Sequence, residues 1–402
     1  MKNSNSPLYF MLALILPISG FICASLNPKM QSYRTLLVLF FTFVGIAFLF
    51  TSGGDVSRYV DEFILITTKK MSLIDYYNSQ PAAQQIDYYN IFMTWFLSRL
   101  TSNPHVYLGI LAFVPTVFLT QNVLYISEKC SDSSRYRFLL FILVLTPNVL
   151  FLTHRWWTAL QIFLFGMLPY ILMNKTKRLW ICLLAVGVHF SFLFPLMLLL
   201  LYMFLPKRAL FPYLLVFVAT YFVSILNFDF VSNVINQVLP TNYADRSVAY
   251  LSNKDDILQG WAFNSLFRLH NLLNLIFAIF IFFRLKVELK CNDFLRHLLI
   301  ISLIMASFAQ LTNMTDWGWR YFDLSNFLFT SLLVIIVANH QLYKKLKILF
   351  RLSYPFFCFF LVMFVHHLFA VISLTSLLVG NYFTIWFIDE EVSVLEYIKN
   401  VL

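Results

Sequence analysis

Apolar stretches of roughly 15 to 27 residues recur from one end of the chain to the other. A helix needs about 20 apolar residues to cross the hydrocarbon core of a bilayer, so these stretches match membrane-spanning helices. Because 60% of the 402 residues are hydrophobic and only 12% are charged, an ordinary soluble globular domain is excluded. The sequence therefore predicts an all-α, polytopic membrane protein, with residues 1–402 forming a single integral membrane domain.

Basic residues indicate which side of the membrane each loop faces. Lysine and arginine number 29 against 19 acidic residues, but they fall mainly in short loops, as expected on the cytoplasmic side, and do not indicate a nucleic-acid partner. These basic clusters are 27–34, 127–137, 174–178, 206–208, 284–296 and 343–351. Since the chain must cross the bilayer an even number of times between two of them, we expect about twelve transmembrane helices, within a range of eleven to thirteen.

The requirement for an even number of crossings between basic clusters decides how several ambiguous segments are interpreted. Residues 104–127 make one good span, which leaves 86–100 as an amphipathic or partly inserted helix with aromatic residues at the interface. Residues 179–205 have basic clusters at both ends, which favours a re-entrant hairpin whose apex, near His189, lies below the outer surface. Residues 8–26 show no small-residue cleavage site and are expected to form a retained first helix.

The polar segments fall on the outer side of the membrane. They are a motif loop with an amphipathic helix at 52–103 and a large loop at 227–262. In the first of these, Asp55, Arg58 and Tyr59 are spaced at i, i+3 and i+4 on one face of a helix. That face could bind sugar hydroxyls or phosphate. An interfacial helix that Asp55 caps, with exposed ion pairs, is the alternative.

Two further arginines lie beside apolar helices. Arg155 is followed by two tryptophans, and Arg320 lies between Asp316 and Asp323 at helical spacing. A charge within the bilayer costs roughly 2.5 to 3.5 kcal/mol, so a recessed arginine needs a partner or a ligand. A pyrophosphate is a suitable ligand because a guanidinium can donate two parallel hydrogen bonds to it. An interface anchor at Arg155 and an internal Asp316–Arg320 pair are the alternatives.

Histidines on the same side are candidates for proton transfer. His189 lies at the expected hairpin apex with Ser191 two residues on, and an imidazole can accept a hydroxyl proton near neutral pH. A structural histidine with satisfied hydrogen bonds is the alternative. Arg268 and His270 open the span after the long outer loop and could line the same recess. We find no phosphate-binding glycine loop, serine nucleophile elbow or metal-spaced histidines in the sequence, so we expect neither a metal nor another cofactor.

Taken in order, these motifs resemble the EpsG/Wzy-type polymerases of bacterial exopolysaccharide and O-antigen. The matching elements are a GGD…RY element after the second helix, an arginine that starts a later helix, an HxS element and a late WRYF turn. The resemblance covers most of the chain. It implies a metal-independent glycosyltransferase of the bacterial inner membrane. Such an enzyme transfers a growing chain from undecaprenyl pyrophosphate to the next undecaprenyl-pyrophosphate-linked oligosaccharide on the periplasmic side.

The resemblance and the chemistry together suggest roles for individual residues. Arg155 and Arg320 are expected to bind the departing pyrophosphate with Arg58 positioning it, and His189 or Asp55 is expected to be the base. Residues expected to contact the sugars are Tyr59, Tyr243, Arg246, Arg268 and His270. Besides the lipid-linked oligosaccharide and the bilayer, the candidate partners are a chain-length regulator and a flippase of the same pathway.

Three other functions fit part of the pattern. A polyprenyl-phosphate-sugar-dependent glycosyltransferase would also use an acidic outer loop, but that loop usually follows the first span and such enzymes carry a larger outer domain. A flippase for the lipid-linked unit would need charges lining a cavity at mid-membrane depth, whereas here the motifs lie on one side. A membrane O-acetyltransferase would have to reach its acyl donor from the cytoplasmic side, where the sequence has only basic loops.

Overall fold

The computed structural model describes residues 6–26, 32–49, 55–80, 88–130, 136–145, 154–226, 261–312, 318–388 and 392–401. Within these ranges the regular structure is helical, apart from two isolated β-bridges. Five described helices are long and apolar enough to cross a membrane. The all-α membrane fold is therefore confirmed, while the count of about twelve spans stays a prediction.

The five helices of membrane length are α7 (Pro104–Ser127), α9 (His154–Met173), α18 (Asp293–Thr312), α19 (Gly318–Ala338) and α20 (His340–Val371). Further apolar helices are α1 (Ser6–Ile15), α2 (Pro17–Leu26), α3 (Tyr33–Ile46), α8 (Arg137–Leu145), α10 (Ile181–Val188), α11 (Leu193–Phe204), α12 (Phe211–Leu226) and α16 (Trp261–Arg284). The other described α-helices are α4 (Asp55–Lys69), α5 (Leu73–Ser79), α6 (Tyr88–Ser98), α17 (Lys286–Cys291), α21 (Leu374–Leu378) and α22 (Val394–Val401).

Basic residues from separate loops meet at one end of the helix bundle, which we call the basic end. Lys129, after α7, lies 5.1 Å from the ring centre of Phe294 at the start of α18. Arg178, after α9, donates a hydrogen bond to the hydroxyl of Tyr125 near the end of α7. Loops that are distant in sequence therefore share one side, as the even number of crossings between basic clusters requires.

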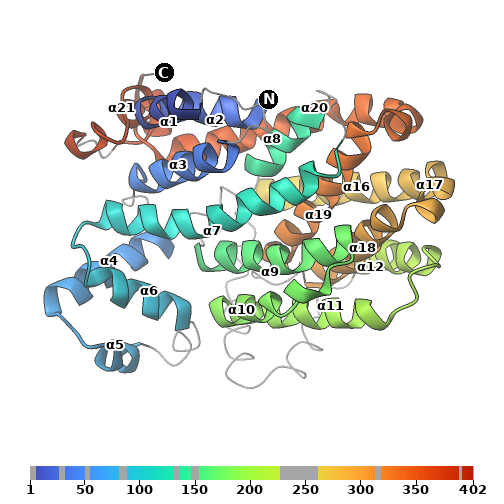
Figure 1. Cartoon of the computed structure of the whole chain (residues 1–402), viewed down its shortest axis with the longest axis horizontal. Helices are drawn as coiled ribbons and strands as arrows, with labels where there is room; N and C mark the ends of the chain where they lie inside the picture. The colour runs from blue at the N-terminus through green and yellow to red at the C-terminus, as the bar shows by residue number, and fades with distance from the viewer. Residues whose placement is uncertain are drawn as a thin grey trace.

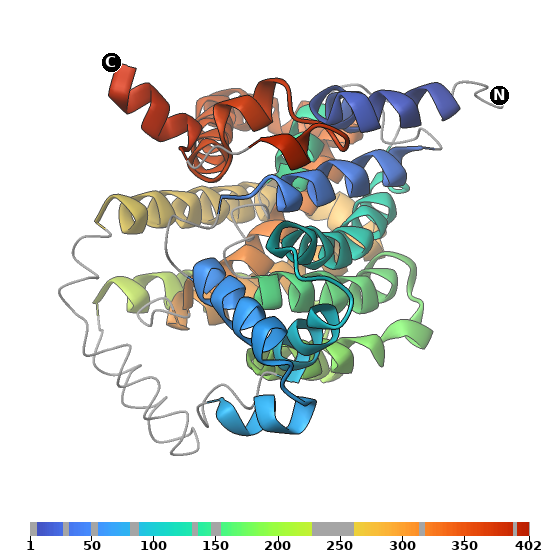
Figure 2. The ribbon, with the colours of Figure 1, turned by 90° about the vertical axis from the view of Figure 1, so that its left-hand side faces the viewer.

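The opposite end, which we call the motif end, holds α4, α5 and α6 beside the starts of α7 and α9. Figure 1 shows these three helices together at one end of the longer ones, and Figure 2 views them from that end. With 11 residues, α6 is too short to cross a bilayer. The helix expected within 86–100 is thus present as α6, and its amphipathic or partly inserted position in the membrane stays a prediction.

Two glycines allow α3 and α7 to pack closely. A Cβ added at Gly45 would lie 2.7 Å from the Cβ of Ala112, and one added at Gly109 would lie 2.6 Å from Cγ1 of Ile46. Small residues let helix backbones approach, which matters in lipid because the hydrophobic effect does not drive helices together there. This contact fixes the end of α3 beside the first half of α7, directly under the motif end.

Buried polar side chains also join neighbouring helices. Their hydrogen bonds run from Asn122 Nδ2 to Gln161 Oε1 (2.8 Å, α7 to α9), from Thr220 Oγ1 to Gln310 Oε1 (2.7 Å, α12 to α18) and from Asn274 Nδ2 to Asn326 Oδ1 (2.8 Å, α16 to α19). An amide without a partner is costly to bury in an apolar medium, so each pair specifies how its two helices are aligned.

The chain reverses direction at His189, as the sequence predicts for 179–205. α10 begins after the turn that follows α9, and the ring of His189 at its end lies 5.6 Å from that of Trp156 near the start of α9. α11 then returns, and Lys207 beyond it donates a hydrogen bond of 3.1 Å to the hydroxyl of Tyr170 near the end of α9. Both arms therefore start and finish toward the basic end, with the apex pointing to the motif end.

The N-terminal stretch differs from the single first helix expected over 8–26. The chain bends between α1 and α2, because Pro17 has no N–H to continue the helical ladder. The bend is sharp, since a Cβ added at Gly20 would lie 2.7 Å from that of Ala13. Each half has 10 residues, too few to cross a bilayer alone.

The basic cluster at 343–351 lies within α20 rather than in a loop. Asn339 caps this helix, because its side-chain oxygen accepts a hydrogen bond of 3.0 Å from the backbone N–H of Gln341. Lys345 in the second turn is paired with Glu288 of α17. Long basic side chains can keep their charge near water while their stems lie along a helix, so a helical start is compatible with this composition.

The glycine contact gives a stability prediction. Gly45→Ala should lower the free energy of unfolding by about 1 to 3 kcal/mol, because the new methyl group overlaps Ala112 in a packed interface. Gly187→Ala is the matched control, since a Cβ there would meet nothing within 4 Å and alanine favours a helix. The midpoint of thermal unfolding in detergent would measure both, and equal midpoints for the two variants would contradict the packing argument.

Candidate functional site

Asp55, Arg58 and Tyr59 of the GGD…RY motif lie in the first turns of α4, and the two faces of this helix have different surroundings. Val56 and Tyr59 belong to an apolar stripe that is buried against α7, and Tyr59 is only 2% exposed. On the other face Arg58 Nε lies 3.9 Å from Glu62 Oε1, with side-chain exposures of 40% and 16%. This ion pair is thus partly buried, unlike the fully exposed pairs of a simple interfacial helix.

Glu62 is held in turn by α5. The Tyr76 hydroxyl donates a hydrogen bond of 3.0 Å to Glu62 Oε2. Burial, together with the nearby Glu62 carboxylate, raises the pKa of Tyr76, so this tyrosine stays protonated and remains a donor. The carboxylate therefore has one arginine and one hydroxyl as partners, and the direction of Arg58 depends on both α4 and α5.

Tyr59 is the ring on which two arginines from different helices meet. The guanidinium carbon of Arg58 lies 5.0 Å from the ring centre, and that of Arg155, on α9, lies 5.3 Å from it. The ring of His154 packs edge-on against the same tyrosine, with centres 4.5 Å apart and planes at 83°. The structure thus brings together three residues that the sequence singles out, Arg58, Tyr59 and Arg155.

His154 is a member of this cluster that the sequence did not single out. It is buried, at 4% exposed, and its Nε2 lies 3.1 Å from Oδ1 of Asn90 on α6. Since an amide oxygen can only accept, Nε2 carries a hydrogen atom and donates the hydrogen bond to Asn90 Oδ1. The available signal was a polar residue directly before Arg155 at a helix start, but nothing in the sequence relates it to α4 or α6.

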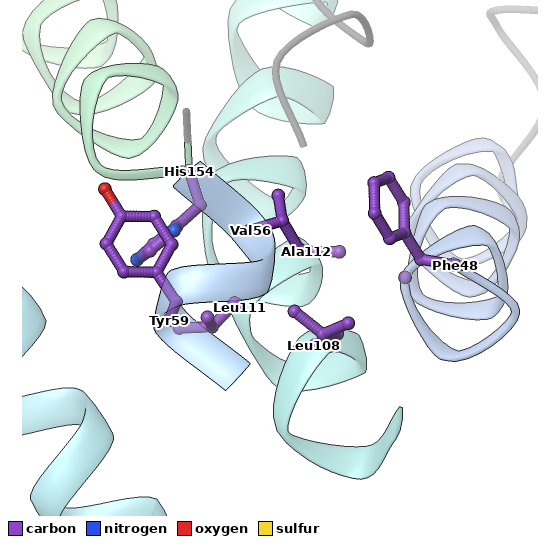
Figure 3. A pocket seen from close by; sticks show the side chains of 8 residues that line it. Phe48, Val56, Tyr59, Leu108, Leu111, Ala112 and His154 are labelled. Atoms are coloured by element: carbon purple, nitrogen blue, oxygen red, sulfur yellow. The ribbon is translucent and has the colours of Figure 1, made fainter. Parts of the chain in front are cut away.

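A small pocket opens beside Tyr59 and His154 (Figure 3). Its lining residues are Gly45, Phe48, Val56, Tyr59, Leu108, Leu111, Ala112 and His154. Six of the eight have no polar side-chain atom. They come from the end of α3 and the residues just after it, the start of α4 and the first half of α7. The arginine cluster therefore adjoins an apolar surface, an arrangement suited to a ligand with both a charged and an apolar part.

Trp156, the residue after Arg155, joins α9 to two other motifs. Its ring packs edge-on against His189 (5.6 Å, 88°) and against Tyr321 (5.5 Å, 87°). The Tyr321 hydroxyl donates a hydrogen bond of 3.1 Å to the carbonyl oxygen of Ser191, and Ser191 Oγ lies 2.6 Å from Nδ1 of His189. The α10–α11 reversal and the start of α19 are therefore fixed around one buried indole.

Arg320 precedes Tyr321 at the start of α19, just as Arg155 precedes Trp156 in α9, so both arginines belong to the motif end. One turn beyond Arg320, Asp323 has a buried oxygen, Oδ2, with no hydrogen-bond partner among the residues that the structure describes. The site thus offers guanidinium groups, an imidazole and a carboxylate. Together these can bind an anion and accept a proton.

The other candidate residues fall elsewhere or outside the described part. Tyr243 and Arg246 lie outside the described residues. Asp55 is the first residue of α4 and Arg268 lies within α16, and the side chains of both are outside the described part. The ring of His270 packs against Phe360 of α20, with centres 4.5 Å apart. Within the described ranges, no group of three or more His, Cys, Asp or Glu side chains could hold a metal ion.

Comparison with known proteins gives one match. The family model described as the EpsG family matches residues 32–376, which include α3 to α20 and every candidate residue. No curated protein and no solved structure matches the chain. The functional argument therefore depends on the family match and on the geometry of the site.

The buried hydrogen bond of His154 gives a prediction. Asn90→Ala should lower the free energy of unfolding by about 1 to 3 kcal/mol, because the Nε2–H would be buried without an acceptor. The double variant Asn90→Ala, His154→Leu removes both partners and should recover part of that loss. Thermal unfolding in detergent measures both effects. A double variant less stable than the sum of the two single losses would argue against this hydrogen bond.

Proposed function

The chain belongs to the EpsG family, and from this membership and the geometry of the motif end we propose that it is a polysaccharide polymerase of the bacterial inner membrane. Membership supports a polymerase type of function, and the apolar helices support a membrane location. In our proposal the enzyme joins undecaprenyl-pyrophosphate-linked oligosaccharide units on the periplasmic side, during synthesis of O-antigen or an exopolysaccharide.

The observation that carries the proposal is the meeting of Arg58 and Arg155 on the ring of Tyr59. His189 packs against Trp156, the residue that follows Arg155 in α9. This cluster lies at the end of the bundle opposite the basic residues, where a periplasmic substrate would arrive if the basic end faces the cytoplasm. A flippase would instead place its charges along a path through the middle of the membrane. The arrangement therefore favours chemistry at one surface.

The reaction breaks the bond between the anomeric carbon and the pyrophosphate oxygen, and forms a bond from that carbon to a sugar hydroxyl oxygen. Negative charge develops on the departing pyrophosphate, and a proton leaves the hydroxyl. Arg155 and Arg320 would stabilise that charge and Arg58 would position it, each fixed donor being worth a factor of about 10² to 10³ in rate. His189 or Asp55 would accept the proton, a step worth about 10² to 10⁴.

The contact between His189 and Ser191 bears on which nitrogen can act. If Nδ1 is protonated and donates a hydrogen bond to Ser191 Oγ, then Nε2 is the nitrogen that can accept a proton from the sugar. The hydrogen bond from Tyr321 fixes the Ser191 backbone, which holds the imidazole in place. This arrangement supports His189 as a candidate base, and Asp55 stays the alternative.

The remaining assignments follow from the proposed reaction. Sugars would contact Tyr59, Tyr243, Arg246, Arg268 and His270, with the loop at 227–262 closing over them. The polyprenyl tail would lie along apolar helix surfaces next to the motif end, where the pocket beside Tyr59 is mainly apolar. A chain-length regulator and a flippase of the same pathway are the expected protein partners.

Arginine variants test the pyrophosphate assignment. Arg155→Ala and Arg320→Ala should each reduce polymerisation by about 10² to 10³ while the protein stays inserted in the membrane. Arg99→Ala is the control, because Arg99 lies after α6 at the same end but contacts Trp95 and the Met71 carbonyl instead of the cluster. The measurement is the chain-length distribution of surface polysaccharide on a gel. Normal chain lengths in both test strains would contradict the assignment.

Deletion of the gene tests the reaction itself. The ladder of surface polysaccharide should collapse to a lipid core bearing a single repeat unit, because synthesis and flipping of the unit would continue without polymerisation. Loss of the single unit as well would indicate a flippase or an earlier glycosyltransferase. An unchanged ladder would indicate a modifying enzyme or a separate pathway.

A further inference from the structure

Tyr59 has more contacts with the candidate site than a sugar-binding role requires. Its ring carries two guanidinium groups, from Arg58 at 5.0 Å and Arg155 at 5.3 Å, although the ring itself is buried. A guanidinium within about 6 Å of an aromatic ring centre is attracted to the ring, more strongly where water is excluded. The two arginines come from α4 and α9, so this one ring determines how they lie relative to each other.

The ring is itself held by a chain of contacts from a third helix. His154 packs edge-on against Tyr59 with centres 4.5 Å apart, and its Nε2 donates to Asn90 Oδ1 across 3.1 Å. Asn90 belongs to α6, and both His154 and Asn90 are buried. Rotation of the tyrosine ring would therefore disturb a buried hydrogen bond, and the ring has little freedom to move.

Two guanidinium groups held on one ring place their N–H donors close together, and Arg58 also faces Glu62 at 3.9 Å. A pyrophosphate carries enough oxygen atoms and charge to accept hydrogen bonds from both guanidinium groups at once. Donors that are already fixed lose less conformational entropy on binding than free arginine side chains do. A rigid tyrosine under both arginines would therefore raise affinity for pyrophosphate without touching it.

We propose that Tyr59, supported by His154 and Asn90, is a positioning residue that holds Arg58 and Arg155 as a pair for one pyrophosphate group. This inference rests on the proposed function. It differs from the role in sugar contact expected for Tyr59, because the ring acts through the two arginines and its hydroxyl is not needed. The two roles give opposite results when only the hydroxyl is removed.

The experiment measures binding of farnesyl pyrophosphate to the purified chain in detergent by titration calorimetry, with farnesyl monophosphate as the comparison. Tyr59→Leu should weaken pyrophosphate binding about tenfold, because both ring contacts are lost. Tyr59→Phe should stay within about twofold of the unsubstituted protein, because the ring remains. In a background of Arg155→Ala, Tyr59→Leu should cost clearly less than tenfold, since one of its two arginines is already absent.

Tyr107→Leu is the matched control for a loss of packing. Tyr107 is also a buried tyrosine at the motif end, but it stacks on Phe63 and shares a hydrogen bond with Thr94. Its substitution should lower the unfolding temperature and leave the pyrophosphate affinity of the folded protein unchanged. A matching loss of affinity in this variant would mean that general packing explains the result, and would overturn the positioning role.

The remaining outcomes separate this proposal from the proposed function. If the unsubstituted protein does not prefer the pyrophosphate to the monophosphate, the proposed function fails, and the positioning role fails with it. If it does prefer the pyrophosphate and Tyr59→Leu binds equally well, only the positioning role is overturned. A loss in Tyr59→Phe equal to that in Tyr59→Leu would show that the hydroxyl matters, and would return Tyr59 to direct contact with the ligand.

Discussion

Polar groups in the interior of a bilayer have no water to bind, so each must find a partner within the protein. The described helices meet much of this requirement with buried hydrogen bonds between side chains, such as Asn122 with Gln161 and Asn274 with Asn326. Asp323 Oδ2 at the motif end is an exception, with no hydrogen-bond partner among the described residues. These bonds set the alignment of helices whose apolar surfaces alone would allow sliding. The arginines of the candidate site lie instead near the starts of α4, α9 and α19, at the motif end.

Much of the architecture follows from the sequence, because the length of the apolar stretches and the even number of crossings between basic clusters are strong constraints. The span at 104–127 is α7, the reversal at His189 is present, and α18 and α19 flank the turn expected between them. The N-terminal bend was missed, because the apolar pattern runs through Pro17 and only the missing N–H interrupts it. The number of spans cannot be counted from the apolar pattern alone, because short or broken helices that cross the membrane have the same composition as those that re-enter it.

Most residues of the candidate site could be predicted from the sequence, but their arrangement in space could not. Spacing within one helix places Arg58 beside Tyr59, but no spacing rule relates α4 to α9, nearly a hundred residues later. The shared ring, and His154 with its support from Asn90, therefore emerge only from packing. For α4, the sequence left open an interfacial helix or a binding surface, and the structure combines features of both: a buried apolar stripe below a partly buried ion pair.

The length of α10, the first arm of the hairpin, determines how far His189 lies from the basic end. α10 has 8 residues, which is a helix of about 12 Å, whereas the hydrocarbon core of a bilayer is about 30 Å thick. His189, which is partly buried, therefore lies only about 12 Å along the bundle from the start of α10. Each additional helical turn in that arm would move the imidazole by about 5.4 Å, so in the proposed reaction the length of α10 would set how far along the bundle the sugar hydroxyl must reach.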